Sequence, residues 1–166
     1  MRLIVGVLSQ KNCFVSLPAG LFKLPDTPGP IVCRLEWAAN GLKQAFVSWM
    51  GTITQTKGTI EIPIPIGNFV EVTVVAEARV ARMVHVQPES SDDWEILELN
   101  ARQVEDKLLS QINVLTGGKA FPFWIDSNKL IYLRMVASQE YSKLGVNTEV
   151  VVAPRVRHHE DSRPAA

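Results

Sequence analysis

The residues that could carry chemistry are few and widely spaced. His85 lies inside a predicted strand, and the other two histidines, His158 and His159, lie near the end of the chain. A Ser-His-Asp arrangement would have to use His85, and a lone strand histidine is far more often a structural or surface residue. The pair Asp92-Asp93 could serve acid–base catalysis or metal binding. Both carboxylates fall where a helix start attracts negative charge, so we expect capping instead.

Other catalytic motifs fail at defined positions. Thr116-Gly-Gly-Lys-Ala120 lacks the upstream glycine of a phosphate-binding loop and carries Ala120 where a magnesium-binding hydroxyl belongs. Asp26-Thr-Pro-Gly29 resembles an aspartic-protease triplet interrupted by a proline, without a second copy. Cys13 and Cys33 form no CxxC pair and have no histidine at zinc-ligand spacing. We predict no catalytic residue, no cofactor, no metal and two reduced, buried thiols.

Composition narrows the class of protein further. The chain has 166 residues, 46% of them hydrophobic, and its 17 basic and 17 acidic residues give zero formal net charge. A neutral chain lacks the positive surface that nucleic-acid binding normally needs. The apolar run 3–8 is too short for a secretory signal, and no run approaches the length of a membrane span. We expect a cytoplasmic, monomeric domain with a substantial core.

The first half of the chain predicts short strands. Apolar and polar residues alternate from Ile31 to Trp37, and Asn40-Gly41 supplies the positive φ of a type I′ turn before a second strand that reaches Trp49. Residues 59–65 contain two prolines, each of which removes a ladder donor, so we place them at an edge or a crossing.

Two more strands are expected to pair with each other, at residues 69–75 and 80–86. Residues 17–24 predict a short helix. Many short strands with so little helix indicate a closed barrel over residues 1–87.

The hydrophobic period changes after Pro88. Apolar residues then recur at spacings of three and four, which is typical of one helical stripe: Leu97, Ala101, Val104, Leu108 and Ile112. Asp92 with Glu95, and Asn100 with Gln103, have the spacing of capping boxes, so we predict two consecutive helices.

A hairpin and a closing strand complete the second half. Residues 120–125 and 130–136 predict the hairpin, and residues 149–153 predict the strand that closes its sheet. The fold class is therefore β-rich α+β, with a barrel subdomain at 1–87, a small α+β subdomain at 88–155 and a flexible tail or linker at 156–166.

Two groups of side chains are candidates for surface contacts. Trp94 could stack on a ligand, or pack its indole across the seam between the subdomains, as aromatic burial favours. Four basic residues could form a modest face for lipid headgroups or an acidic partner: Arg79, Arg82, Lys119 and Arg134. Because they are separated in sequence, solvated charges explain them more economically.

Several segments resemble a known family. Residues 67–72 and 79–88 look like the last barrel strands of the N-terminal domains of type II AAA ATPases, such as valosin-containing protein and N-ethylmaleimide-sensitive factor. Residues 91–99 (Ser-Asp-Asp-Trp-Glu-Ile-Leu-Glu-Leu), 108–112 and 120–126 are similar to the N-terminal domain of the peroxin-one family of peroxisome-biogenesis AAA ATPases. The resemblance covers most of residues 10–155. It departs from the family at 62–66, where a short helix is usual.

The resemblance implies a fold and a role. It implies a double-psi β-barrel followed by a small α+β subdomain, acting in adaptor or substrate recognition without catalysis. The full-length family forms a hexamer with a partner peroxin ATPase and extracts ubiquitinated import receptors. The domain would then be cytoplasmic and peripheral at the peroxisomal membrane. The family's ATPase modules lie outside these 166 residues.

Related N-domains bind adaptors in the cleft between their subdomains. Carried onto this sequence, one cleft wall includes Val70 and Val72, and the other comes from the hairpin 121–132. Alternation puts both valines on one strand face, so they line either the barrel core or the cleft. Aromatic residues are enriched where partners bury surface, which adds three candidates: Trp94, Trp124 and Tyr132.

Two other function classes stay open. The N-terminal domain of peroxin-one has been linked to phospholipid binding, so a module for phospholipid headgroups is one alternative. An enzyme built on a double-psi barrel, as in aspartate decarboxylase, is the other. That enzyme cleaves itself at a Gly-Ser dipeptide, which this chain does not contain.

Overall fold

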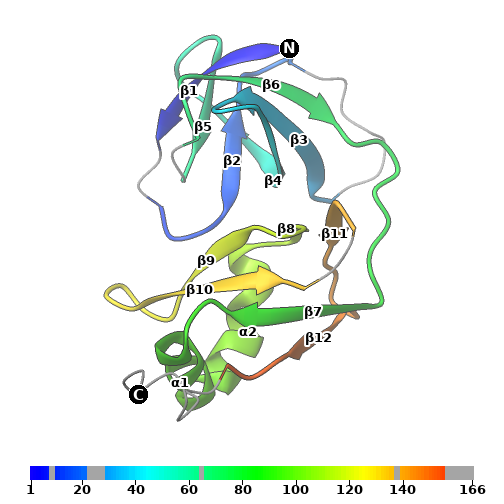
Figure 1. Ribbon diagram of the computed structural model, residues 1–166. Coiled ribbons are helices and arrows are strands. Elements are labelled where there is room, and N and C mark those ends of the chain that lie inside the picture. Colours follow the sequence, from blue (N-terminus) through cyan, green and yellow to red (C-terminus); the bar gives the residue numbers. More distant parts are fainter. Residues whose placement is uncertain (8–9, 22–28, 64–65, 137–138, 156–166) are drawn as a thin grey trace.

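The computed structural model describes residues 1–7, 10–21, 29–63, 66–136 and 139–155. Two subdomains lie one against the other, with a barrel above and a sheet with helices below in the view of Figure 1. Within the described residues, no helix is long and apolar enough to cross a membrane. The sequence-predicted tail at 156–166 lies outside the described residues.

The first subdomain is a closed six-stranded barrel of the double-psi type. Its strands follow the order β1-β5-β2-β4-β3-β6, and the β1–β5 and β2–β4 pairs are parallel. The strands are β1 (Arg2–Val7), β2 (Phe14–Leu17), β3 (Ile31–Ala38), β4 (Leu42–Ile53), β5 (Thr59–Ile62) and β6 (Phe69–Val74). The prediction of a barrel in the first half of the chain is confirmed.

Alternate residues of each strand fill the barrel. In β3, Cys33 and Leu35 are buried in the barrel core, while Arg34 and Glu36 face outward and form an ion pair of 3.2 Å. This is the period-2 pattern of a strand with one buried face. The predicted hairpin is also confirmed, because Ala38 pairs with Leu42 and both Asn40 (φ 53°) and Gly41 (φ 108°) have positive φ.

Residues 59–65 were predicted to lie at an edge or a crossing, and the prediction of an edge was wrong for residues 59–62. Strand β5 is not an edge, because it pairs with β1 on one side and β2 on the other. The strand ends at Ile62, so Pro63 follows the ladder and interrupts no hydrogen bond. Residues 64–65 lie outside the described part of the chain. A short helix was predicted at 17–24. Its first residue, Leu17, ends β2, and residues 22–24 also lie outside the described part of the chain.

The second subdomain contains a four-stranded sheet of order β12-β7-β10-β9 and a two-stranded sheet of β11 and β8. Its elements are β7 (Met83–Pro88), α1 (Ser91–Leu99), α2 (Ala101–Gln111), β8 (Val114–Thr116), β9 (Ala120–Trp124), β10 (Leu130–Met135), β11 (Tyr141–Lys143) and β12 (Glu149–Val152). The predicted hairpin of β9 and β10 and the closing strand β12 are both confirmed.

Strand β7 corrects one expected pairing. We expected it to pair with the strand before it and to end the barrel, but it pairs with β10 and β12. Its burial alternates, with Val84 and Val86 in the core of the second subdomain. Alternation fixes a strand's face and not its partner. The change from one sheet to the other therefore falls in residues 75–82 rather than at residue 87.

Two consecutive helices form as predicted, but their caps differ. The side chain of Ser90, rather than Asp92, caps α1 by accepting a hydrogen bond of 3.0 Å from the backbone N–H of Asp93. Asn100 precedes α2 without a side-chain cap, since its amide donates to the carbonyl of Ile96. Gln103 donates to the carbonyl of Ile125 and so ties α2 to the hairpin.

Candidate functional site: an apolar cavity at the seam between the subdomains

Some side chains on the outside of the barrel are buried because the second subdomain covers them. Val32, Phe46 and Val114 form a small core across the seam. The rings of Phe46 and Tyr141 stack with centroids 4.6 Å apart. The seam is thus a packed contact between β3 and β4 on one side and β8 and β11 on the other.

The hydroxyl of Thr116 joins the two subdomains. It accepts a hydrogen bond of 2.8 Å from the backbone N–H of Phe46 and donates one of 3.2 Å to the carbonyl of the same residue. Thr116 thereby acts on β4 as a neighbouring strand would. Near the start of β2, the backbone N–H of Cys13 donates to the carbonyl of Gln111 at 2.7 Å. These bonds fix the relative position of the cavity walls.

A cavity of about 290 Å³ opens beside this contact. Its walls come from both subdomains and are mostly apolar: Cys13, Trp37, Ala45, Phe46, Val47, Ile62, Pro63 and Ile66 on the barrel side, and Ile112, Val114, Thr116, Lys119, Ala120 and Phe121 opposite. A concave, mainly apolar site with a few polar groups is the usual form of a binding pocket.

Lys119 is the charged side chain of this cavity wall. Its ammonium lies 4.5 Å from the centroid of the Trp37 ring, a cation–π contact that crosses the seam. Burial lowers the pKa of Lys119, and the nearby charge of Lys43 lowers it further. The cavity can therefore hold an apolar group and offers a cation at its rim.

Cys13 lines the cavity, but its thiol is not a nucleophile. Burial raises the pKa of this thiol to about 12, so it stays protonated at neutral pH. Its Sγ donates to the carbonyl of Pro122 at 3.6 Å. Cys33, in the barrel core, is also a free thiol whose pKa burial raises to about 12. The expectation that both cysteines are reduced and buried is confirmed.

The structure corrects three of the residues proposed for the cleft. Val70 and Val72 are each 1% exposed and their side chains belong to the barrel core, so neither side chain forms a cleft wall between the subdomains. Trp94 packs against the core of the second subdomain. Its helix, α1, lies on the side of the sheet away from the barrel in Figure 1, so its indole does not cross the seam.

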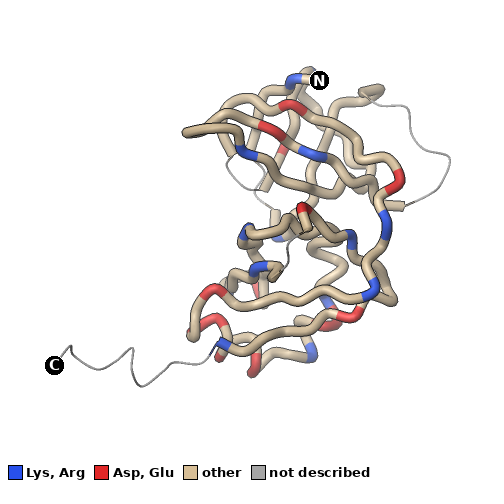
Figure 2. The backbone as a smooth tube through the Cα atoms, turned by 45° about the vertical axis from the view of Figure 1, so that its right-hand side comes forward, with Lys and Arg blue, Asp and Glu red and all other residues tan. Residues whose placement is uncertain are grey.

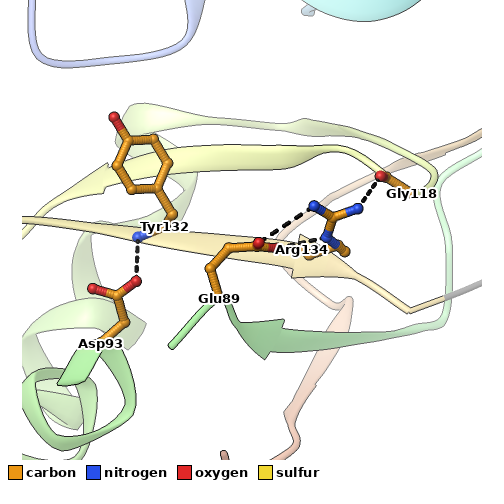
Figure 3. A network of polar contacts seen from close by, with 5 residues as sticks. All are labelled: Glu89, Asp93, Gly118, Tyr132 and Arg134. Atoms are coloured by element: carbon orange, nitrogen blue, oxygen red, sulfur yellow. Dashed lines mark hydrogen bonds and ion pairs between the residues drawn. The ribbon is translucent and has the colours of Figure 1, made fainter. Parts of the chain in front are cut away.

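Trp124 and Tyr132 are brought together on one sheet face. Trp124 pairs with Leu130, and Tyr132 pairs with Pro122, so the side chains of all four residues share the face opposite Ile131 and Leu133. Tyr132 is 45% exposed and points away from α1, toward the barrel, as Figure 3 shows. Tyr132 thus remains a candidate contact next to the seam.

Arg134, a candidate for the basic face, is held by its own subdomain. Its guanidinium donates to both carboxylate oxygens of Glu89 and to the carbonyl of Gly118 (Figure 3). This hydrogen bond holds the pKa of Glu89 below its ordinary value and raises that of Arg134. Arg79 and Arg82 are exposed between β6 and β7. Figure 2 shows basic and acidic positions interspersed along both subdomains.

The acidic pair at the start of α1 has a structural role. An oxygen of Asp93 accepts from the backbone N–H of Tyr132 at 3.4 Å, just beyond the end of β7 (Figure 3). This contact extends the ladder on β10 and seats the helix on the sheet. In the described part of the chain, no group of three or more His, Cys, Asp or Glu residues is arranged to hold a metal ion.

Sequence reasoning missed the barrel wall of the cavity. Trp37 was assigned only to a strand, and Lys119 only to a basic face, because no local pattern links residues so far apart in the sequence. The apolar residues 62–66 were a better signal. They depart from the resembled family, and Ile62, Pro63 and Ile66 all line the cavity.

Comparison with known proteins agrees with this architecture. A family model described as peroxisome biogenesis factor 1, N-terminal, matches residues 82–154. The chain is 28% identical over 182 residues to peroxisomal ATPase PEX1 of Dictyostelium discoideum, an alignment that covers 95% of this chain and 15% of that protein. It is 26% identical over 172 residues to peroxisomal ATPase PEX1 of Homo sapiens, covering 95% of this chain and 13% of that protein.

A shorter alignment is closer in identity. Over 84 residues the chain is 37% identical to peroxisomal ATPase PEX1 of Cricetulus griseus, covering 49% of this chain and 6% of that protein. The chain therefore spans less than a fifth of the length of these relatives. Residues 82–154 therefore match the peroxisome biogenesis factor 1 N-terminal family, and most of the chain is similar to peroxisomal ATPases PEX1.

Proposed function

We propose that this chain is a non-catalytic recognition module of a peroxisomal AAA ATPase and binds a protein partner in the seam cavity. The observation that carries the proposal is the position of the cavity, which has apolar walls from two subdomains held together by hydrogen bonds across the seam. The partner is an adaptor or a ubiquitinated import receptor. A module of this kind would act at the peroxisomal membrane as part of a hexamer with a second peroxin ATPase.

Ala120 offers a way to block the cavity without disturbing either core. It lines the cavity and is exposed, so a larger side chain there would enter the cavity rather than the packed interior. Ala120→Trp is the test variant. Ala101→Trp is its matched control, because Ala101 is exposed at the start of α2 and does not line the cavity.

The experiment introduces each variant into the full-length peroxisomal ATPase and measures release of ubiquitinated import receptors from isolated peroxisomal membranes. We expect Ala120→Trp to leave receptors on the membrane, while Ala101→Trp releases them like the unmodified protein. ATP hydrolysis should be unchanged in both. Normal release with Ala120→Trp would contradict the proposed role of the cavity.

Phospholipid binding has less support. Two of the four basic candidates already make intramolecular contacts, since Arg134 binds Glu89 and Lys119 lies over Trp37. Arg79 and Arg82 remain exposed and can be tested together by flotation with liposomes.

A further inference from the structure

Two hollows meet at Trp37. Trp37 lines the seam cavity of about 290 Å³ and also an open groove of about 480 Å³ on the barrel. The groove lies beside the start of β6, where a Cβ added to Gly67 would lie 3.7 Å from the Trp37 ring. The two hollows therefore share one aromatic wall, and we call the pair the track.

The size of the cavity fits side chains rather than a whole small molecule. A dry apolar cavity of about 150 Å³ is enough to bind benzene, and this cavity is about twice that volume at 290 Å³. Two apolar side chains would fill it, and in an extended peptide they belong to residues i and i+2, which share one face. The remainder of an extended ligand, at about 3.3 Å per residue, would lie along the groove past Trp37.

Lys119 supplies a positive charge where the two hollows meet. The nearby charge of Lys43 acts on it there, and among the described residues neither ammonium forms an ion pair. Burial and a neighbouring cation both make the protonated, charged form of a lysine less favourable. An anionic group bound at this point would offset both effects and would add a charge-assisted hydrogen bond.

We infer that the track binds an extended peptide in which two apolar side chains enter the cavity and an adjacent acidic side chain pairs with Lys119 beside Trp37. The inference rests on the proposed function and adds to it the chemical class of the partner. A linear peptide suits the track better than a lipid because the cavity is short and shares its Trp37 wall with a groove that also holds charged groups: Arg2, Glu36 and Glu71.

The test uses fluorescence anisotropy with the 166-residue chain and labelled synthetic peptides. The probe carries Phe-Ser-Leu-Glu-Glu within a Gly/Ser sequence, and two matched peptides carry Phe-Ser-Leu-Gln-Gln or Ala-Ser-Ala-Glu-Glu. We expect binding of the first peptide and weaker binding of both others. Lys119→Gln should weaken the acidic peptide about tenfold, as for loss of a charged hydrogen bond, and leave the Gln-Gln peptide unchanged.

Two further variants separate charge from folding. Lys119→Arg keeps the cation and the stacking on Trp37, and should retain binding. Lys107→Gln removes an exposed charge from α2 and should have no effect. Equal binding of acidic and neutral peptides, or an unchanged affinity with Lys119→Gln, would overturn the inference. The inference would also be overturned if no peptide binds and the chain instead sediments with phosphatidylserine vesicles in a way that Lys119→Gln abolishes.

The proposed function can stand or fall separately. If Ala120→Trp blocks receptor release but the acidic and neutral peptides bind equally, the acidic-peptide inference is refuted and the recognition role stands. If Ala120→Trp leaves receptor release intact, the recognition role is refuted whatever the peptides do.

Discussion

The hydroxyl of Thr116 gives the seam its most specific polar contact, so Thr116→Val is the sharpest test of how the two subdomains are joined. Valine matches threonine in shape but cannot hydrogen-bond. The N–H and carbonyl of Phe46 would both lose their contact with the Thr116 hydroxyl, at a residue that is 4% exposed.

Leaving a buried polar backbone group unsatisfied costs about 1–3 kcal/mol. Valine also removes the cost of taking the Thr116 hydroxyl out of water. This gain in free energy offsets part of the loss of the two hydrogen bonds to Phe46. We therefore expect the free energy of unfolding to fall by about 2 kcal/mol, which moves the urea midpoint by roughly 1 M.

Equilibrium urea unfolding measures this change, and hydrogen exchange locates it. The amide of Phe46 should exchange faster in the variant, because the seam hydrogen bond that protects it is lost. Thr116→Ser keeps the hydroxyl and should retain most of the stability. Thr73→Val is the matched control on the exposed outer face of β6, with an expected change within about 0.5 kcal/mol. A Thr116→Val protein as stable as the unmodified chain would refute the assigned contact.

Three further perturbations follow from the same structure. Val70→Asp places a charge in the barrel core and should destabilise the fold by about 4 kcal/mol or unfold it, whereas Thr73→Asp on the outer face of β6 should fold normally by circular dichroism. Gly117→Ala should lower stability by about 1–3 kcal/mol in thermal unfolding, because an added Cβ would clash with the backbone carbonyl oxygen of Gln139; a variant as stable as the parent would contradict that close approach. The lowered pKa of Glu89 stabilises the fold above the ordinary value of 4.5, and this contribution is lost as the pH falls through the lowered value. Glu89→Gln should therefore flatten the acid side of the stability profile, by less than about 1 kcal/mol for an exposed pair, and an unchanged profile would contradict the pairing with Arg134.

Local patterns predicted local structure well. Asn40-Gly41 predicted the hairpin of β3 and β4 because a type I′ turn needs two residues with positive φ. The apolar stripe from Leu97 to Ile112 predicted two helices because a helix repeats every 3.6 residues. Each signal lies within one or two elements, so the local structure that it predicts does not depend on contacts with the rest of the chain.

Partners distant in sequence could not be predicted in the same way. The alternation in β7 fixed which side chains are buried but was equally consistent with either sheet. Val70 and Val72 illustrate the same limit, because one alternating pattern fits a barrel core or a cleft wall. Ser90 rather than Asp92 caps α1 because the boundary lies two residues from that expected, within the usual uncertainty of helix ends.

The seam cavity depends on contacts that only the folded chain creates. Lys119 meets Trp37 because β8 packs on β4 and carries the turn after Thr116 toward the end of β3. The two glycines in that turn belong to the segment that was rejected as a phosphate-binding loop on its sequence. Instead, Gly117 permits a close backbone approach to Gln139, and the carbonyl of Gly118 accepts from Arg134.

Site-specific photo-crosslinking tests the central claim most directly, because it asks what touches the seam cavity during receptor release. A photoreactive benzoylphenylalanine in place of Ala120 of the full-length peroxisomal ATPase is compared with the same group in place of Ala101. The account predicts a crosslink to an adaptor or import receptor from position 120 and none from position 101. Equal crosslinking from both positions, or a crosslink from position 101 alone, would contradict it.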